Sequence, residues 1–378
     1  MLIQGARILN DRFDWEYGDL RIVEDRIEQI GQLEPLPGEK VFAAEGKNLI
    51  PGMIDVHMHG YHGISCAAKT PEEVKNIGVY LAKEGVTGYA AGIASSPDEK
   101  AFRAIRNNVI ASKEWKKSNG AEILGIHMEG PFLNPVKKGA MNEKAIVSPS
   151  AVTMRQYLDL SEGLFKIMTI APEMPGAEEV IRMGVKYGVK MSIGHTNATY
   201  EQTKTSFSWG ISRATHTFNA MPSLNHRQSA VLGAVLNEDT IQCELIGDFV
   251  HVAPEVCQIL IRQKGTDRIT LISDSCELGG LPPEMIPPEL PYVIGRAAYL
   301  PNGTLCGSIC TVAVCVRNMM TLGIPMNEAV RMGTINPAKD LGLQDEYGSI
   351  REGKKASLVL TDDQLQVSAV WVRGKQYM

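Results

Sequence analysis

Eight short apolar segments in the middle of the chain, separated by amphipathic stretches, limit the folds that this sequence can adopt. They cover residues 54–59, 86–92, 123–127, 165–171, 189–195, 211–216, 241–247 and 269–274. Apolar strands that alternate with helices form parallel sheets, because two parallel strands need a long crossover connection between them. Eight such units predict an α/β fold with a closed (β/α)8 barrel of the TIM type, whose functional face lies at the carboxyl ends of the strands.

The two ends of the chain show a different pattern. Residues 1–50 contain short alternating strands with turns between them, and residues 346–378 alternate in the same way. Strands this short need another sheet to form a stable core. We therefore expect one small β-sandwich built from both termini, with residues 51–345 inserted between them as the barrel domain.

Helix starts between the predicted strands carry capping-box sequences. At 70–73, 96–99 and 199–202, a Ser or Thr precedes a Glu or Gln by three positions, and Pro follows the Ser or Thr in the first two. In a capping box the two side chains bond each other's backbone N–H groups at the first turn. The sequence therefore predicts that three helices begin at these positions.

The composition excludes several classes of protein. Of the 378 residues, 44% are hydrophobic and 21% are charged, and the net charge is −5. This balance is that of an ordinary globular protein and gives no reason to expect nucleic acid or a membrane as partner. No apolar run is as long as a membrane span and residues 1–10 lack the layout of a signal peptide, so we expect a cytoplasmic location. The seven cysteines form no Cys-x-x-Cys pair, which favours reduced thiols.

Histidines gather at the predicted strand ends. The sequence Pro-Gly-Met-Ile-Asp-Val-His-Met-His-Gly at 51–60 places His57 and His59 two residues apart, so both imidazoles point to one face of a strand. The pair alone fits a metal site and two packed histidines equally well. All eight histidines lie between residues 57 and 251, and five of them close an apolar strand: His57, His59, His127, His195 and His216. At the carboxyl end of a barrel these five side chains would converge.

Three carboxylates share this location: Glu129, Asp248 and Asp274. A divalent cation held by histidine and carboxylate lowers the pKa of bound water to roughly 7. A separate carboxylate then moves a proton to the leaving group, and Asp274 fits that role best. The set predicts a metal-dependent hydrolase. The alternatives are that Asp274 caps a helix, that Glu129 forms a salt bridge, and that His127 supports a ligand or only packs.

Several motifs occur in the order found in one family. Besides residues 51–60 they are 127–132 (His-Met-Glu-Gly-Pro-Phe), 171–173 (Ala-Pro-Glu), 194–198 (Gly-His-Thr-Asn-Ala), 215–221 (Thr-His-Thr-Phe-Asn-Ala-Met), 273–274 (Ser-Asp), 336–338 and 348–354. With them the chain resembles the amidohydrolase superfamily, and within it the deacetylases of N-acetylhexosamine 6-phosphates. The resemblance implies hydrolysis of N-acetylglucosamine 6-phosphate to glucosamine 6-phosphate and acetate, a step of amino-sugar catabolism.

The resemblance also implies a set of metal ligands. Glu129, His195 and His216 match the ligands of the principal metal. His57 and His59 match a second metal position that some members use and others have lost. Many relatives bridge two metals with a carboxylated lysine after strand four, but residues 169–172 contain no lysine, so Glu129 would take over. The cofactor would be divalent Zn, Fe, Mn or Co, with one or two ions per chain.

Other positions match groups that act on the substrate. Asp274 matches the general base that later serves as acid, and His251 matches the histidine that holds the acetamide carbonyl. The region that grips the sugar phosphate is matched by Asn219, the Ala220 backbone, His226 and Arg227. The last two reach in from a neighbouring subunit in such proteins, which implies a homodimer or a dimer of dimers. An arginine fork suits a phosphate dianion.

Departures from the family pattern fall on loops that would face the substrate. Where the family reads Glu-Pro-Gly after Arg227, this chain has Gln228, Ser229 and Ala230, and Met141 stands where histidine is usual. The resemblance therefore bears on the chemistry more than on the exact substrate. Two alternatives stay open. One is a related amidohydrolase acting on another N-acyl sugar phosphate or N-acyl amide, and the other is a non-catalytic sugar-phosphate-binding protein.

Overall fold

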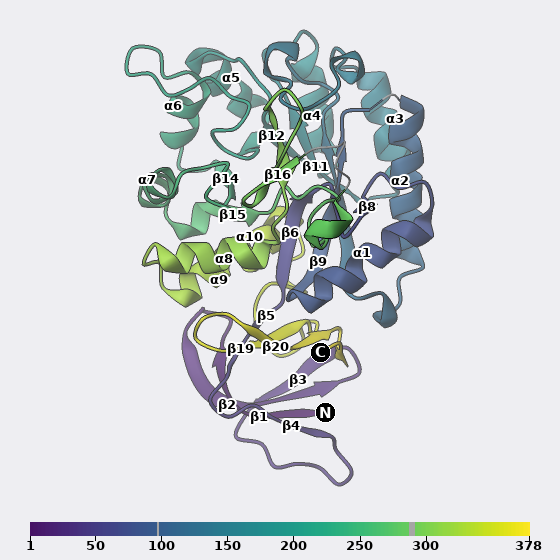
Figure 1. The fold of residues 1–378 in the computed structure, drawn as a ribbon, viewed down its shortest axis with the longest axis vertical. Helices are drawn as coiled ribbons and strands as arrows, with labels where there is room; N and C mark the ends of the chain where they lie inside the picture. The colour runs from purple at the N-terminus through teal and green to yellow at the C-terminus, as the bar shows by residue number, and fades with distance from the viewer. Residues whose placement is uncertain (97, 287–291) are drawn as a thin grey trace.

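A computed structural model describes residues 1–96, 98–286 and 292–378. The chain forms a large unit of strands surrounded by helices and a smaller sheet unit at one end of it, and both chain termini lie in the smaller unit (Figure 1). The arrangement matches the predicted barrel with a sandwich built from both ends. The domain boundaries at 50/51 and 345/346 stay predictions.

Eight parallel strands form the barrel. They are β6 (Met53–Met58), β9 (Val86–Ala94), β10 (Glu122–Glu129), β11 (Phe165–Ile170), β12 (Lys190–Ile193), β13 (Ile211–Ala214), β14 (Gln242–Ile246) and β15 (Ile269–Ile272). Each pairs in parallel with the next along the chain. The last returns to the first where the Asp274 backbone N donates to the His57 carbonyl O at 2.8 Å. All eight predicted strands are confirmed.

Helices surround this barrel (Figure 1). They are α1 (Pro71–Lys83), α2 (Asp98–Lys113), α3 (Ala151–Ser161), α4 (Ala177–Lys186), α5 (Tyr200–Trp209), α6 (Ala230–Leu236), α7 (Pro254–Lys264), α8 (Val312–Thr321), α9 (Met326–Gly333) and α10 (Ile335–Asp340). Two predicted capping boxes are present: Thr70 with Glu73 opens α1, and Thr199 with Gln202 opens α5. The third includes residue 97, which lies outside the described residues; α2 begins directly after it.

The smaller unit is one sheet of eight strands drawn from both ends of the chain. They are β1 (Leu2–Leu9), β2 (Trp15–Val23), β3 (Arg26–Gly31), β4 (Val41–Ala43), β5 (Asn48–Pro51), β19 (Leu358–Thr361), β20 (Val367–Val372) and β21 (Lys375–Gln376). β5 joins the two ends, because it pairs with β1 on one side and with β19 on the other. The sheet encloses its own apolar core, with Trp371 fully buried among residues such as Leu20 and Ile27. β5 then leads directly into β6 of the barrel.

Two small sheets stand at the carboxyl ends of the barrel strands. The hairpin of β7 (Gly60–Tyr61) and β8 (Ile64–Ser65) follows β6. The sheet of β16 (Tyr292–Ile294), β17 (Ala297–Tyr299) and β18 (Leu305–Ser308) follows β15. It is attached to the barrel because the Ser308 backbone N donates to the Asp274 carbonyl O at 2.9 Å. Both sheets therefore border the face on which the predicted site lies.

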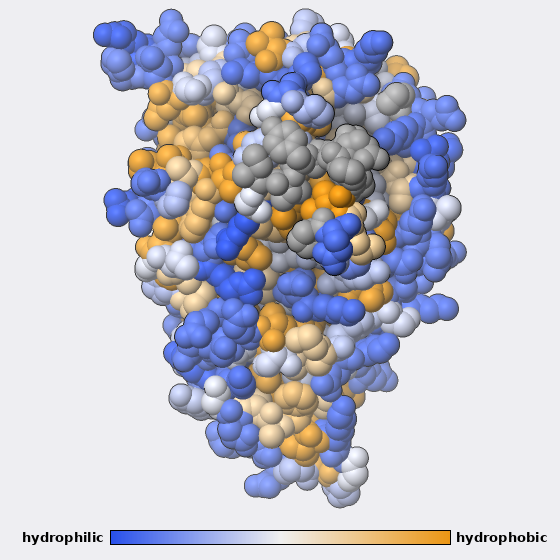
Figure 2. Space-filling view, in the orientation of Figure 1, coloured by the Kyte–Doolittle hydropathy of each residue, from blue (hydrophilic) through white to orange (hydrophobic). Residues whose placement is uncertain are grey.

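The visible face of the molecule is mostly hydrophilic, with hydrophobic residues in separate patches (Figure 2). Large apolar side chains that stay exposed, such as Tyr17 and Val136, are spread over different elements. Within the described ranges, no helix has the length and apolar character needed to cross a membrane.

Candidate metal centre and active site

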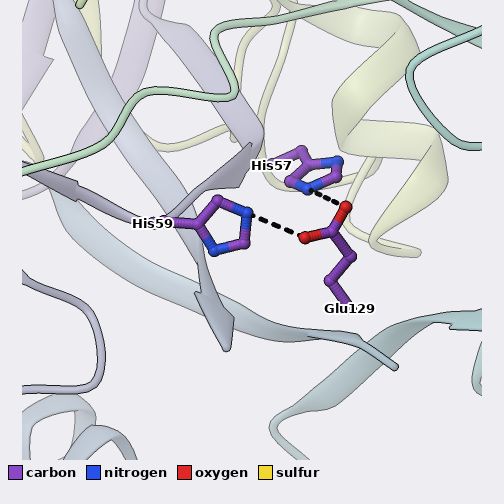
Figure 3. Close-up of side chains that lie close together, drawn as sticks. All are labelled: His57, His59 and Glu129. Atoms are coloured by element: carbon purple, nitrogen blue, oxygen red, sulfur yellow. Dashed lines mark ion pairs between the residues drawn. The ribbon is translucent and has the colours of Figure 1, made fainter. Parts of the chain in front are cut away.

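The Glu129 carboxylate, at the end of β10, lies among four histidines. Its Oε1 atom is 3.1 Å from His195 Nε2 and 2.9 Å from His216 Nε2. Oε1 is also 3.5 Å from His57 Nε2, whereas Oε2 is 3.0 Å from His59 Nε2. Figure 3 shows the imidazoles of His57 and His59 pointing at the two oxygens of this one carboxylate. The structure thus brings together all five predicted metal ligands.

Three residues of the site lie just beyond their strands in a left-handed backbone conformation. His195, His216 and Asp274 have φ values of 47°, 28° and 48°, and each follows the last residue of its strand by two positions. Non-glycine residues adopt this region at a cost of about 1–3 kcal/mol, which surrounding structure must offset. The sequence pattern predicts that these residues close their strands, so the turn is a correction. The turn directs the side chains toward the common centre.

For His195 and His57, hydrogen bonds fix which ring nitrogen faces Glu129. His195 Nδ1 donates to the Lys137 carbonyl O at 2.7 Å, and His57 Nδ1 donates to Glu244 Oε2 at 2.9 Å. The Nε2 atoms are therefore the ones left for the centre of the cluster. Nε2 of His57 is buried and has no hydrogen-bond partner within the described part of the chain. A buried imidazole nitrogen that points at a carboxylate and has no hydrogen-bond partner fits the role of a metal ligand.

The ligand atoms form two sets that fit a divalent cation. Glu129, His195 and His216 offer atoms that all lie within 4.8 Å of one another, and so do His57, His59 and Glu129. Imidazole nitrogen with carboxylate oxygen suits Zn, Fe, Mn and Co. Glu129 belongs to both sets. The prediction that it takes the bridging position is consistent with this geometry.

The charges of the cluster favour a cation at its centre. Burial opposes protonation of His57, but the Glu244 and Glu129 carboxylates outweigh it and hold the pKa of His57 well above its ordinary value. Burial likewise opposes protonation of His59, whose pKa the nearby carboxylates, led by Asp274, raise to about 10. Against the effect of burial, the imidazoles hold the pKa of Glu129 well below its usual range. Positive charge is therefore stabilised here, as protons in the metal-free protein or as a metal cation.

His127 is not a ligand, although it lies in the same interior. Its Nδ1 donates to the Val56 carbonyl O at 3.0 Å, and its Nε2 accepts from Thr169 Oγ1 at 2.8 Å. Burial, followed by the charge of His57, lowers the pKa of His127 to about 3, which keeps the ring neutral. The ring centroids of His127 and His57 are 4.2 Å apart, a contact that fits both alternatives for His127, support of a ligand and packing alone.

Asp274 stands beside the second ligand set. Its Oδ1 is 3.3 Å from His59 Nε2 and 3.6 Å from His57 Nε2, and its side chain is 13% exposed, against 4% for Glu129. No helix begins at Asp274 in the part of the chain that the structure describes, so the helix-cap alternative is wrong. For Glu129 the described ion-pair partners are the four histidines and no lysine or arginine, so any salt bridge that it forms is with the predicted metal ligands themselves.

A cavity of about 1070 Å³ opens over the cluster. Its described lining includes His59, Glu129, His195, His216 and Asp274, and further out Met141, Asn219, Ala220 and His251. Two predicted substrate residues are elsewhere: His226 and Arg227 are exposed and do not line the cavity of their own chain. The structure therefore unites the predicted chemistry with Asn219 and Ala220 of the predicted phosphate grip, but not with its other two members, His226 and Arg227.

His251 is held by a carboxylate three residues earlier. Its Nδ1 donates to Asp248 Oδ2 at 2.6 Å, while Asp248 Oδ1 accepts from the His251 backbone N at 2.9 Å. Burial opposes protonation of the ring, but Asp248 outweighs it and raises the pKa of His251. Only the protonated ring has a second N–H to offer the cavity, because Nδ1–H is already engaged.

Sequence reasoning missed a buried charged group behind the cluster. Glu244 on β14 accepts from His57 and from Arg213 on β13, whose Nη2 lies 2.8 Å from Glu244 Oε1. Arg213 also forms an ion pair with Asp340. The signal was present, because an arginine and a glutamate interrupt two apolar strands, and such residues are almost never buried unless paired. Neither forms part of a recognisable motif.

Comparison with known proteins adds an independent line of support. The pattern of the Amidohydrolase family matches residues 48–377. The N-acetylglucosamine-6-phosphate deacetylase of Lysinibacillus sphaericus is 34% identical, over 97% of this chain and 94% of that protein. The N-acetylgalactosamine-6-phosphate deacetylase of Escherichia coli O157:H7 is 30% identical, over 99% and 98%.

A solved structure is similar over the same length. The crystal structure of N-acetylglucosamine-6-phosphate deacetylase from Pasteurella multocida superposes with a TM-score of 0.91 and 29% identity, covering 99% of this chain and 98% of that one. The barrel fold, the two sets of histidines with Glu129, and the length of these matches all indicate the same family. The chain belongs to the amidohydrolase family and is a metal-dependent hydrolase.

Proposed function

We propose that the protein removes the acetyl group from an N-acetylhexosamine 6-phosphate, with N-acetylglucosamine 6-phosphate as the leading substrate and glucosamine 6-phosphate and acetate as products. One observation carries the proposal. The Glu129 cluster and Asp274 line a single cavity, in a chain that matches a deacetylase of this substrate over 97% of its length.

The metal would be held by Glu129, His195 and His216, and a second ion by His57 and His59 together with Glu129. Zn, Fe, Mn and Co all suit these donors, and one or two ions fit the two sets. When bound, such an ion lowers the pKa of water to roughly 7 and polarises the amide carbonyl.

Asp274 serves as the proton carrier of the reaction. Its carboxylate takes a proton from the attacking water as the new carbon–oxygen bond forms, and gives it to the amide nitrogen as the carbon–nitrogen bond breaks. Burial raises the pKa of Asp274, but the charges of His57 and His59 and the hydrogen bond from His59 outweigh it and lower the pKa, so the carboxylate is ionised before it takes the proton. His251, in its protonated form, donates a hydrogen bond to the carbonyl oxygen where negative charge develops.

The phosphate would be bound with help from a second subunit. Among the described residues that line the cavity, none is a lysine or an arginine. His226 and Arg227 lie in a run of six exposed residues, 223–228, and would reach the cavity of a neighbouring chain in a homodimer or dimer of dimers. Asn219 and the Ala220 backbone, which line the cavity, would grip the sugar phosphate from within the same chain. A cytoplasmic location belongs to this proposal, because a sugar phosphate dianion does not cross a membrane unaided.

N-acetylgalactosamine 6-phosphate is the second candidate substrate. It differs from the first only in the configuration at carbon 4, and the Escherichia coli O157:H7 relative named for it covers 99% of this chain. Met141 lines the cavity where histidine is usual in the family, so the substrate-facing loops differ from the common pattern.

Acetate release tests the proposal. Metal-loaded protein is assayed with both N-acetylhexosamine 6-phosphates, with the two sugars lacking phosphate and with an N-acetyl amino acid. We expect release from one or both phosphates and a loss of at least about tenfold in kcat/KM without the phosphate, as for one lost charge-assisted contact. Release only from the amino acid would favour the other amide substrate. Phosphate-dependent binding without release would favour a binding protein.

A further inference from the structure

Glu244 lies fully buried inside the barrel and contacts one histidine from each ligand set. Its Oε2 accepts from His57 Nδ1 at 2.9 Å and from the His216 backbone N at 3.1 Å. Its Oε1 accepts from Arg213 Nη2 at 2.8 Å. All three partners are donors, so the site requires an acceptor with two oxygens.

We propose that Glu244 is a positioning residue for both metal positions. It holds His57 in place for one position and His216 in place for the other. The inference rests on the assignment of the metal centre and not on which sugar is hydrolysed. Glu244 itself touches neither the cavity nor Glu129 among the described contacts.

The contact with His57 decides which nitrogen serves the metal. Because Nδ1 donates to Glu244, the ring is oriented with Nε2 toward Glu129, 3.5 Å away. A metal-bound imidazole is commonly oriented in this way by a carboxylate on its other nitrogen, and loss of such a partner costs about 10–100-fold in metal affinity.

The contact with His216 holds a strained backbone. His216 has a φ of 28°, and its N–H group and that of Thr217 both bond to a single residue on the next strand. The His216 N donates to the Glu244 side chain, and the Thr217 N donates to the Glu244 carbonyl O at 2.9 Å. Glu244 therefore offsets the cost of the turn that directs His216 toward Glu129.

Arg213 and Asp340 fix Glu244 in turn. Arg213 is 1% exposed and bridges the two carboxylates, and Asp340 Oδ2 accepts from Thr270 Oγ1 at 2.6 Å. Breaking a buried ion pair is costly because it leaves an unpaired charge, so Glu244 has little freedom to move.

Glu244 is not proposed as a metal ligand. It lies within 4.8 Å of nitrogen atoms of His57 and His127, but both ring nitrogens of His127 are already engaged. The second oxygen of Glu244 accepts a hydrogen bond from the Arg213 guanidinium, whose positive charge disfavours a metal cation at the same place.

The test compares Glu244→Gln with a matched control, Glu39→Gln. Glu39 also pairs with a largely buried arginine, Arg21 at 3.0 Å, but lies in the loop between β3 and β4, away from every histidine of the site. Zinc is titrated into metal-free protein against a competing chelator, and unfolding is followed by circular dichroism. We expect about 10–100-fold weaker zinc binding for Glu244→Gln and unchanged binding for Glu39→Gln, although both lose stability.

Three results would overturn the proposal: wild-type zinc affinity in Glu244→Gln, equal weakening in both variants, or weakening that follows the loss of stability. If Glu244→Gln does not fold, nitrogen NMR of zinc-loaded wild-type protein labelled at histidine replaces it, with His57→Gln to assign the signal. We expect a proton on Nδ1 of His57, and a proton-free Nδ1 would refute the role. Because both readouts follow metal and not acetate, they stand or fall separately from the proposed substrate.

Discussion

The cluster of metal-ligand side chains around Glu129 and the exposed run at residues 223–228 are built in two different ways. In the cluster, Glu129 is 3% exposed and contacts four histidines that come from other strand ends. In the run, every residue is exposed. The Arg227 backbone N donates to a side chain of the same run, Asn225 Oδ1, at 2.9 Å. The barrel alone thus suffices to shape the cluster, whereas the hydrogen bonds described for the run stay within the run itself.

This difference suggests a division of labour. Chemistry depends on distances of a few ångströms between charged groups, so its residues lie in the buried end of a closed barrel. Recognition of a phosphate needs charge and reach, and an exposed segment supplies them when another subunit receives it. Substitutions in the two regions should therefore fail in different ways.

Glu129→Gln should have the largest effect. An amide keeps the shape but removes the negative charge that both ligand sets share, so metal binding and acetate release should both fall below detection. Metal per chain is measured by mass spectrometry and folding by circular dichroism. A folded variant that keeps its metal would contradict the central place of Glu129.

Asp274→Asn should separate chemistry from metal binding. We expect unchanged metal content and a loss of about 10²–10⁴-fold in kcat, the usual contribution of a general acid–base group. Acetate release under saturating substrate measures it. If activity is retained, another group carries the proton.

Arg227→Ala should affect binding more than chemistry. Loss of a hydrogen bond to a charged group predicts a rise in KM for the sugar phosphate of about 10–100-fold with little change in kcat. Metal content should stay unchanged.

Because Arg227 is proposed to act across subunits, mixed oligomers of two variants test whether it serves the site of the neighbouring chain. Arg227→Ala and Asp274→Asn chains are unfolded together and refolded as mixed oligomers. Some sites then combine an intact Asp274 with an intact Arg227 of the partner chain, and activity should return above the sum of the two variants. Absence of recovery would place Arg227 outside the site.

Asp248→Asn should have the smallest effect, seen mainly in the pH profile. Asp248 raises the pKa of His251, so the protonated ring persists to higher pH and its contribution is lost as pH rises through that pKa. Without the carboxylate, the alkaline limb of kcat/KM should move to lower pH. We expect roughly tenfold loss at most near neutral pH, equivalent to one weakened hydrogen bond. An unmoved limb would show that another group titrates there.

The sequence predicted what depends on local pattern. Apolar strands of regular length separated by capped helices led to the barrel, and histidines at their ends led to the ligands. It placed His195 and His216 on strands, whereas they follow them in left-handed turns. Alternation of side chains carries no information on φ, so that difference could not be predicted.

The rest depends on contacts between segments distant in sequence. Thr169, 42 residues away, engages Nε2 of His127 and so keeps it from a metal. Glu244 contacts His57 across 187 residues. A lone glutamate in an apolar strand does not reveal which donors surround it. The roles of His226 and Arg227 stay predictions, because they depend on a second chain.

One titration tests whether the cluster around Glu129 is a metal centre that drives amide hydrolysis. Metal-free protein receives Zn, Mn, Fe or Co in steps, and each sample is analysed for bound metal and for acetate released from N-acetylglucosamine 6-phosphate and N-acetylgalactosamine 6-phosphate. We predict that release rises from zero in proportion to bound metal and levels off at one or two ions per chain. Full activity of the metal-free protein, or no release from either substrate at full metal loading, would contradict the account.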